Sequence, residues 1–161
     1  MNTKRNLIML TAVVALAFGV TACKSSGVAV SNEGHIIAID IEAPETAPAD
    51  EVAAVVVKIM NRGFNKLQES TVEVVMPTEL VVVSQTQSPG VTWNERITAG
   101  GLKLYAYTIN EINVGSTAEI TYHVRTAFGN NQETGKLEVT VLEKKLPGGK
   151  LVETKTIRLQ Q

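Results

Sequence analysis

The chain has 161 residues, of which 44% are hydrophobic and 19% charged, with 15 lysines and arginines against 16 aspartates and glutamates. This length suits one domain, and a nearly neutral chain without a basic stripe is not expected to bind nucleic acid. Cys23 is the single cysteine, which excludes an intramolecular disulfide, so packing alone must stabilise the fold.

The first 22 residues have the layout of a secretory signal. The opening "MNTKR" carries two positive charges and no acid, and the residues from Leu7 to Val20 are almost wholly apolar. This run is shorter than the roughly 20 apolar residues that a membrane-spanning helix needs. We therefore expect a signal helix over residues 1–22 that is removed from the mature protein.

The end of the apolar run, Val20-Thr21-Ala22-Cys23, resembles the lipobox of bacterial lipoproteins, in which an aliphatic residue and two small residues precede a cysteine. The resemblance implies cleavage between Ala22 and Cys23, a diacylglycerol on the Cys23 thiol, and a further acyl chain such as palmitate on its freed amine. Each CH₂ transferred to lipid contributes about 0.8 kcal/mol, so two or three chains make attachment effectively permanent. The alternatives are a buried thiol and an ordinary signal peptide cut nearby.

The same resemblance implies a location in the bacterial cell envelope, with a membrane as one partner. Lys24 follows the cysteine at the position where a sorting rule of enteric bacteria reads Asp as retention in the inner membrane. In a host with two membranes, the outer membrane is therefore implied, on its periplasmic or surface face. Loss of Lys4 and Arg5 with the signal leaves 13 basic and 16 acidic residues, a net charge of −3.

Residues 23–33 are expected to be the lipidated cysteine and a flexible tether, because "KSSGVAVSNE" is mostly small or polar. Fully extended, these ten residues would reach roughly 33 Å. Residues 34–161 are expected to form one folded domain with a C-terminal hairpin.

From residue 34 onward the apolar period is close to two, and no window has the i, i+3, i+4, i+7 stripe of a helix. One stretch sets Ala118, Ile120, Tyr122 and Val124 on a single face, and Pro77 ends another because proline cannot donate to a strand ladder. The prolines of "EAPETAPAD" at 42–50 are expected to interrupt pairing. We expect strands at 35–41, 52–60, 70–76, 80–84, 91–97, 102–109, 117–128, 136–146 and 150–159.

The last two expected strands form a hairpin around "PGG" at 147–149. A three-residue loop suits a type I turn followed by a residue with positive φ, which glycine supplies without steric cost. This loop pairs Leu137 with Leu159 and Val139 with Ile157, so all four side chains are expected in the core.

Eight or nine short strands, with turn signals about every dozen residues, predict an all-β fold, an antiparallel immunoglobulin-like β-sandwich. The stretch 52–127 is also similar to a bacterial surface conserved-repeat family with an Ig-like sandwich. The residues at the family's positions are Asn61, Gly63, Pro77, Leu80, Tyr107, Gly115 and Ser116. The family is largely of unknown activity and is associated with envelopes and surfaces. This chain differs in having one copy, where the family often has several, and in its added hairpin.

Few residues form patterns that indicate catalysis. His35 and His123 lie on separate expected strands, where each is expected to face solvent, and no third ligand completes a metal site. No serine lies in a Gly-x-Ser-x-Gly elbow. Asp40 and Asp50, the only aspartates, form no Asp-x-Asp calcium cluster. We expect no enzymatic activity, no metal and no cofactor.

Trp93, Tyr105 and Tyr107 are the candidate binding residues, because exposed aromatic faces stack against sugar rings. We expect packing instead, with Trp93 in the core and the tyrosines stabilising neighbouring strands. An exposed aromatic shelf would favour a ligand-binding protein, and buried rings would favour a structural or interaction module.

Our first hypothesis is a membrane-anchored envelope lipoprotein whose domain is a non-enzymatic structural or protein-interaction module, with an envelope protein as its partner. The alternative is a module that binds a glycan or small ligand through the aromatic residues. The edge of the C-terminal hairpin is either a docking arm for a partner strand or an edge guarded by charges, and we favour the guarded edge. The charges are Glu143, Lys144, Lys145, Glu153 and Lys155.

Overall fold

The computed structural model describes residues 22–30, 34–49, 51–99, 102–127, 129 and 131–160, so all of the expected signal segment but Ala22 lies outside it. Within these residues lie eleven strands and one short 3₁₀ turn. They are β1 (Ala22–Val30), β2 (Ile36–Pro44), β3 (Thr46–Ala47), β4 (Ala53–Asn61), β5 (Leu67–Met76), β6 (Leu80–Gln87), β7 (Val91–Ala99), β8 (Leu102–Ile112), β9 (Thr117–Thr126), β10 (Thr134–Leu142), η1 (Pro147–Gly149) and β11 (Lys150–Leu159).

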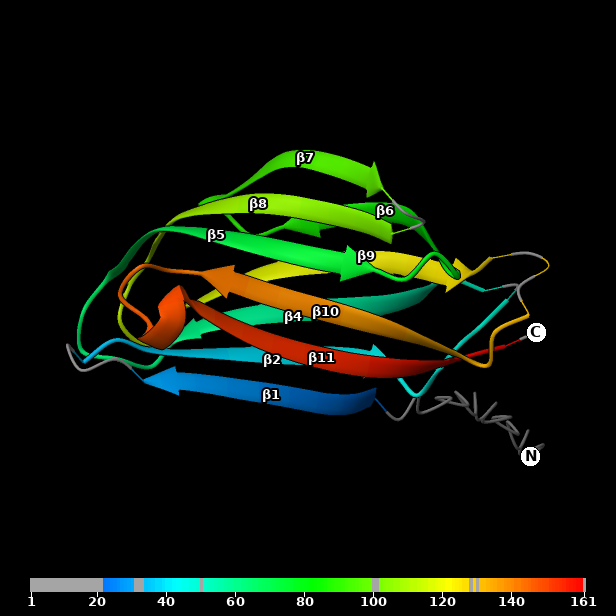
Figure 1. Ribbon diagram of the computed structural model, residues 1–161, viewed down its shortest axis with the longest axis horizontal. Coiled ribbons are helices and arrows are strands. Elements are labelled where there is room, and N and C mark those ends of the chain that lie inside the picture. The colour runs from blue at the N-terminus through cyan, green and yellow to red at the C-terminus, as the bar shows by residue number, and fades with distance from the viewer. Residues whose placement is uncertain are drawn as a thin grey trace, which may run out of the picture.

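The strands form two facing sheets (Figure 1). One has the order β1-β2-β4-β9-β6 and the other β3-β11-β10-β5-β8-β7, and only β3 and β11 pair in parallel. The set β2-β4-β9-β6 opposite β11-β10-β5 has the A-B-E-D and G-F-C order of immunoglobulin domains, with the β7–β8 hairpin inserted after the strand that corresponds to D. The predicted all-β, immunoglobulin-like sandwich is confirmed, with eleven strands where eight or nine were expected.

Alternating apolar residues of both sheets fill the space between them. In β9, Ala118, Ile120, Tyr122 and Val124 are buried, and the polar residues between them are partly exposed. These side chains belong to one hydrophobic cluster that includes residues of both sheets. The alternation that predicted the strands therefore also predicted which face of each strand is buried.

Residues 22–30 form the edge strand β1, so the prediction of a flexible tether over residues 23–33 is wrong for residues 23–30. β1 pairs with β2 along its whole length, from Ala22 opposite Pro44 to Val30 opposite Ile36. Ladder hydrogen bonds come from the main chain, so a segment of small and polar residues can add to an open sheet edge. The sequence pattern gave no sign of this strand, because the strand lacks an apolar alternation.

The proline-containing segment after β2 also contains a strand that was not predicted. After Pro44 the chain passes to the second sheet, where Thr46 and Ala47 of β3 pair with Arg158 and Leu159 of β11. This short strand covers one end of β11. The interruption predicted at the prolines is therefore a change of sheet.

The register of the C-terminal hairpin differs from the prediction by four residues. Leu137 lies opposite Lys155, where Leu159 was expected, and Val139 lies opposite Glu153. A slip by an even number of residues keeps each side chain on its face. The four predicted core residues are therefore buried, as expected.

The cause of the shift is a loop of residues 143–149 in place of the expected three-residue turn. The Glu143 amide donates to the Gly149 carbonyl over 3.0 Å, and the Leu146 amide donates to the Glu143 carbonyl over 3.0 Å. Leu146 is buried at the core, so its packing holds the loop folded inward. The strand ends at Leu142, before the charged residues that were expected within it.

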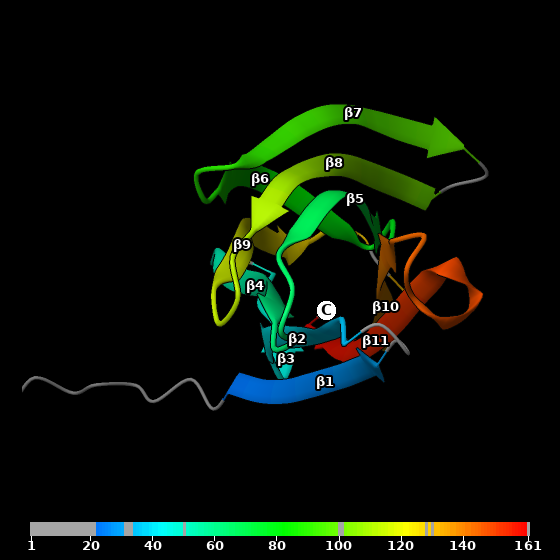
Figure 2. The ribbon, with the colours of Figure 1, turned by 90° about the vertical axis from the view of Figure 1, so that its left-hand side faces the viewer.

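The two lateral sides of the sandwich differ (Figure 2). On the guarded side, defined by β1, β3 and β11, β11 is covered at its end by β3 and lies against β1 and β2. On the open side, defined by β6 and β7, each strand is the last of its sheet. Figure 2 shows the β7–β8 hairpin curving away from the rest of the sandwich.

Candidate functional site

The two candidate tyrosines are core residues. Tyr105 and Tyr107 are both buried, and each meets the ring of Tyr122 edge to face, at centroid distances of 5.5 and 6.4 Å. The Tyr107 hydroxyl donates to Gln85 Oε1 of β6 over 3.1 Å, and burial raises the pKa of Tyr107 to about 12. The packing interpretation is correct for both tyrosines, and no shelf of exposed tyrosines exists here.

Trp93 is 47% exposed, so the prediction of a core tryptophan is wrong. It lies on β7 opposite Tyr107, and the ladder has a β-bulge immediately after it, between Trp93 and Glu95. An edge strand has a neighbour on one side only, so a residue in register with the core can still be half open to solvent. Of the three candidate aromatic residues, only Trp93 has its ring open to solvent.

The two histidines lie far apart in the fold. His35 precedes β2 at one end of the first sheet and is buried, which contradicts the expected solvent-facing position. His123 lies near the other end of β9, partly exposed, with its Nδ1 3.1 Å from Ser84 Oγ. Among the residues that the structure describes, no group of three histidine, cysteine, aspartate or glutamate side chains could hold a metal ion.

Asn61 and Gly63 of the predicted surface-repeat pattern have a structural role. The Asn61 side-chain amide donates to the carbonyls of Ile112 and Asn65, and its Oδ1 accepts from the Gly63 amide. The Asn61 main chain also pairs with Ser116 and Gly115. Asn61 thus joins the loop after β4 to the loop after β8.

Gly63 is fixed by close packing of the main chain. A Cβ at this position would lie 2.4 Å from the Gly34 carbonyl oxygen and 2.6 Å from the Ile36 amide nitrogen. Main-chain atoms of a paired strand cannot move aside easily, so only glycine fits. These pattern residues therefore specify the fold rather than a binding site.

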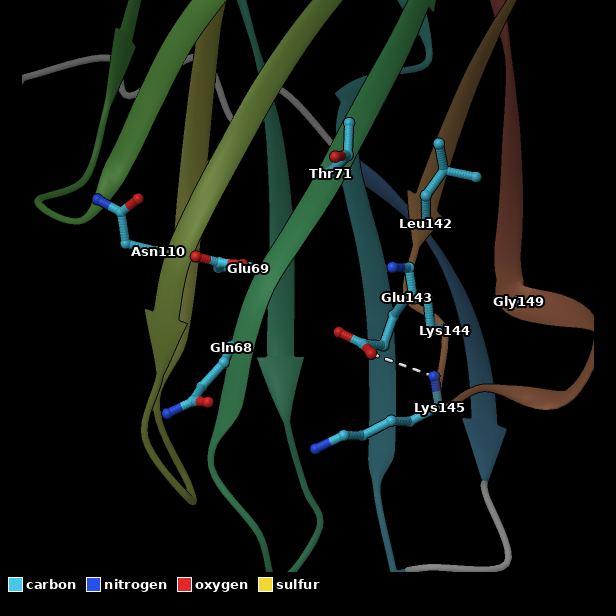
Figure 3. A pocket seen from close by; sticks show the side chains of 9 residues that line it. All are labelled: Gln68, Glu69, Thr71, Asn110, Leu142, Glu143, Lys144, Lys145 and Gly149. Carbon is cyan, nitrogen blue, oxygen red and sulfur yellow. Dashed lines mark hydrogen bonds between the residues drawn. The ribbon is translucent and has the colours of Figure 1, made fainter.

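A polar pocket of about 710 Å³ lies between β5 and the loop of residues 143–149 (Figure 3). Its wall comprises Gln68, Glu69, Thr71, Asn110, Leu142, Glu143, Lys144, Lys145 and Gly149. The buried Glu143 carboxylate accepts from Ser70 Oγ over 2.9 Å and from the Lys145 amide over 3.1 Å. Both of its oxygens thus have partners within the protein.

Glu69 in the wall of this pocket has a φ of 45°, and it is the one non-glycine residue with positive φ in the described part of the chain. Such backbone is disfavoured for residues with a Cβ and costs on the order of 1–3 kcal/mol. The pocket mixes carboxylate, ammonium and amide groups without an aromatic face or a nucleophile–base pair.

β7 is the last strand of the second sheet and has an exposed edge. Residues 92–98 are all exposed, and β8 is the only strand that pairs with β7 in the described chain. The main-chain amides and carbonyls on its outer side are free to pair with another strand. The bulge after Trp93 leaves a regular segment, Glu95–Ala99, paired with β8 from Ala106 to Leu102.

An apolar row on the outer face of the second sheet ends at this edge. The register places Leu104 of β8 between Val75 of β5 and Ile97 of β7, and Ile97 is 44% exposed. With Leu102 these residues line an apolar hollow of about 220 Å³. The periodicity of single strands does not reveal this row, because the row exists only across three paired strands.

Val20 and Thr21 of the predicted lipobox lie outside the described residues. Cys23 of β1 lies opposite Ala43 of β2, and Ala22 lies opposite Pro44. The described residues form no helix that is long and apolar enough to span a membrane.

Comparisons with known proteins support the fold. No family model and no curated protein matches the chain. A cohesin module from a family 33 glycoside hydrolase of Clostridium perfringens is similar over 87% of this chain and 98% of the module, with 11% identity and a TM-score of 0.53. Its likeness supports a two-sheet β-sandwich.

Two further solved structures resemble the chain more weakly. One is AvmM, which catalyses macrocyclization in alchivemycin A biosynthesis, with 12% identity over 81% of this chain and 90% of that one, at a TM-score of 0.48. The other is a non-cellulosomal cohesin from the archaeon Archaeoglobus fulgidus, with 14% identity over 84% and 91%, at a TM-score of 0.44. A likeness of fold does not by itself assign a function.

Proposed function

We propose that the protein is a bacterial envelope lipoprotein, anchored by acyl chains on Cys23, whose sandwich is a non-enzymatic protein-interaction module that binds a partner strand along β7. The observation that carries the interaction is the open edge of β7, exposed over residues 92–98 and bordered by the apolar row Val75–Leu104–Ile97. In a host with two membranes, we place the protein on the outer membrane.

The partner's chemistry follows from the edge. Unpaired main-chain groups select an extended strand, and side-chain positions on alternate residues give specificity. A strand added beside Glu95–Ala99 continues the outer face of the sheet, so an apolar side chain next to Ile97 lengthens the apolar row. We therefore propose an extended segment of another envelope protein, apolar at alternate positions.

A second copy of the chain fits this edge poorly if both copies are anchored in one membrane. In an antiparallel pair of two β7 strands, a two-fold axis perpendicular to the sheet reverses the long axis of one sandwich. The two Cys23 residues would then lie at opposite ends of the dimer. This geometry favours a different protein as partner.

The alternative of glycan binding through the aromatic residues has less support. Tyr105 and Tyr107 are buried, and only Trp93 of the three offers ring surface to solvent. On the guarded side, β3 pairs with one end of β11 and β1 packs against it, while β1 is itself the last strand of its sheet. The interaction hypothesis depends on β7 because its exposed segment borders the apolar row.

The anchor is tested by Cys23→Ser. We expect this variant to lose incorporation of labelled palmitate and to leave the membrane fraction, because no other cysteine can accept the lipid. Unchanged membrane fractionation of the variant, with no palmitate in the parent protein, argues against the anchor.

The docking edge is tested by photo-crosslinking in cells. A photoreactive residue at Thr98 on β7 is compared with one at Thr156 on β11, since both threonines are exposed on lateral strands of the same sheet. We expect a specific adduct from position 98 and none from position 156. Equal adducts from both positions, or an adduct from 156 alone, contradict docking on β7.

A further inference from the structure

The anchor position, the end of β2 and the tip of the β7–β8 hairpin lie at one end of the sandwich. We call this the anchor end and define it by Cys23, Pro44, Val52 and Leu102. β1 begins where β2 ends, with Ala22 opposite Pro44, and β8 begins beside the end of β7, with Leu102 opposite Ala99. In Figure 1 the start of β1 and the arrowhead of β7 lie toward the same end of the molecule.

Because β1 is paired with β2, no flexible tether separates Cys23 from the folded domain. Ladder contacts begin at Ala22, so a lipid on Cys23 is attached to a residue that is already part of the sheet. An unpaired tether of ten residues would have allowed the domain to stand roughly 33 Å from the bilayer. With β1 paired, acyl chains in the bilayer hold the anchor end against the membrane surface.

This end exposes apolar side chains from two separate segments. Val52, which precedes β4, is 50% exposed, and Leu102 is 54% exposed. Val52 also borders an open groove of about 530 Å³, whose wall includes Pro44, Pro48 and Val56. Glu42 and Glu51 line the same groove, and burying such carboxylates in hydrocarbon is costly.

We propose that the anchor end is a membrane-contact surface, on which Val52 and Leu102 enter the headgroup-level interface of the bilayer while the acyl chains of Cys23 enter its core. The inference rests on the proposed lipid anchor. The carboxylates of Glu42 and Glu51 limit the depth of the contact, so the surface lies on the membrane without crossing it.

This contact fixes the posture of the domain. The strands run away from the membrane, and the eleven residues of β8 span about 36 Å at roughly 3.3 Å per residue. The β7 edge is then presented along its length, and the polar pocket near Glu143 faces away from the lipid. A partner that docks on β7 would approach parallel to the membrane. The segment Glu95–Ala99 is the end of β7 nearest the anchor end, so a partner bound there would lie close to the membrane surface.

The test compares two exposed apolar residues at opposite ends. Leu102 at the anchor end is 54% exposed, and Val114 in the loop between β8 and β9 is 53% exposed. Since the lipid occupies the thiol of Cys23, Leu102→Cys and Val114→Cys each provide one free thiol for a bimane label. The lipidated protein is incorporated into vesicles of phosphatidylethanolamine and phosphatidylglycerol with brominated acyl chains.

We expect the brominated lipid to quench bimane fluorescence at position 102. At position 114 we expect the fluorescence to be unchanged. Val52→Cys serves as a second probe of the same end and should be quenched like position 102. Equal fluorescence of both ends in protein that floats with the vesicles overturns the inference and leaves the anchor intact. Protein that does not float, with an unmodified Cys23 by intact mass, overturns both proposals.

A linker variant tests the role of β1 in holding this posture. Inserting about 12 glycine and serine residues between Cys23 and Lys24 adds roughly 20 Å of flexible chain. We expect the lipidated variant still to float with the vesicles, with loss of quenching at position 102. Unchanged quenching at 102 and at 52, with 114 unquenched, would show that apolar contact alone holds the surface on the bilayer, against the role assigned to β1.

Discussion

The guarded and open sides of the sandwich differ in how their sheet edges are covered. Every open sheet has two edges whose main-chain groups can pair with foreign strands. On the guarded side the protein covers β11 with the two-residue strand β3 and packs β1 beside it. On the open side, β6 and β7 carry β-bulges, between Val82 and Ser84 and between Trp93 and Glu95, but no strand covers either within the described residues.

The difference bears on the proposal that β7 binds a partner strand. A bulge interrupts a ladder and increases its twist, which limits unspecific pairing without closing the edge. Apolar side chains of both sides pack against the core, Ala29 of β1 and Leu151 of β11 on the guarded side and Val82 of β6 on the open side. β7 differs because its residues 92–98 are all exposed, so it has surface left for a partner.

Deleting the hairpin from Lys136 to Leu159 should have the largest effect on this contrast. It removes nearly all of β10 and β11, two neighbouring strands of the second sheet, together with the buried Leu137, Val139 and Ile157. We expect loss of cooperative thermal unfolding, followed by circular dichroism. If the truncated chain melts at the same temperature as the full chain, the hairpin does not contribute to the stability of the sandwich. The contrast between the two sides would then have no support.

Two isoleucine-to-alanine variants compare the sides directly. Ile157 of β11 is fully buried, so Ile157→Ala should lower the free energy of unfolding by about 2–5 kcal/mol through lost burial and a cavity. Ile97 of β7 is 44% exposed, so Ile97→Ala should cost about 1 kcal/mol or less. Urea unfolding of both variants measures the difference, and similar losses would contradict the inference that the exposed face of β7 adds little to stability.

Alkaline pH should weaken the tyrosine cluster that lies behind the open side. The pKa of Tyr107 is raised to about 12 in the folded protein, while an unfolded tyrosine titrates near 10. Below about pH 10 this stability is fully present. Between about pH 10 and 12 the unfolded chain binds fewer protons than the folded one, so the free energy of unfolding falls as pH rises.

The size of this effect follows from the shift. At about 1.4 kcal/mol per pKa unit, Tyr107 contributes at most about 3 kcal/mol, which is lost as the pH rises through its folded pKa. Urea unfolding at a series of pH values should show the decline, and Tyr107→Phe should make it shallower. If the substitution leaves the slope unchanged, Tyr107 is not the group that titrates.

Alanine substitutions of two asparagines are expected to differ least in their effect on stability. Asn61→Ala leaves buried main-chain groups of Ile112 and Gly63 without their side-chain partner, at a cost of about 2 kcal/mol. Asn94 of the open edge donates to Thr108 Oγ1 in solvent over 2.9 Å, so Asn94→Ala should change stability by no more than about 0.5 kcal/mol. Thermal melts suffice to rank the two variants, and the reverse ranking would contradict the role given to Asn61.

The sequence by itself determined the sandwich and most of its core. A period of two puts Val72, Val74 and Met76 on one face of β5, and water drives that face inward whatever strand lies beside it. The same alternation correctly predicted that Leu137 and Ile157 are buried, even though the cross-strand partners expected for them were wrong. Alternation is a property of neighbours in the chain, so it can be read without knowing the fold.

Only the tertiary structure decided which strands lie beside one another and which edges stay open. β1 pairs through its main chain, whose hydrogen bonds leave no trace in side-chain pattern. The row Val75–Leu104–Ile97 combines three segments whose proximity depends on register, and Trp93 is exposed because its strand is the last in the sheet. Binding surfaces of this kind arise from long-range pairing, and a single sequence does not encode that pairing in its local periodicity.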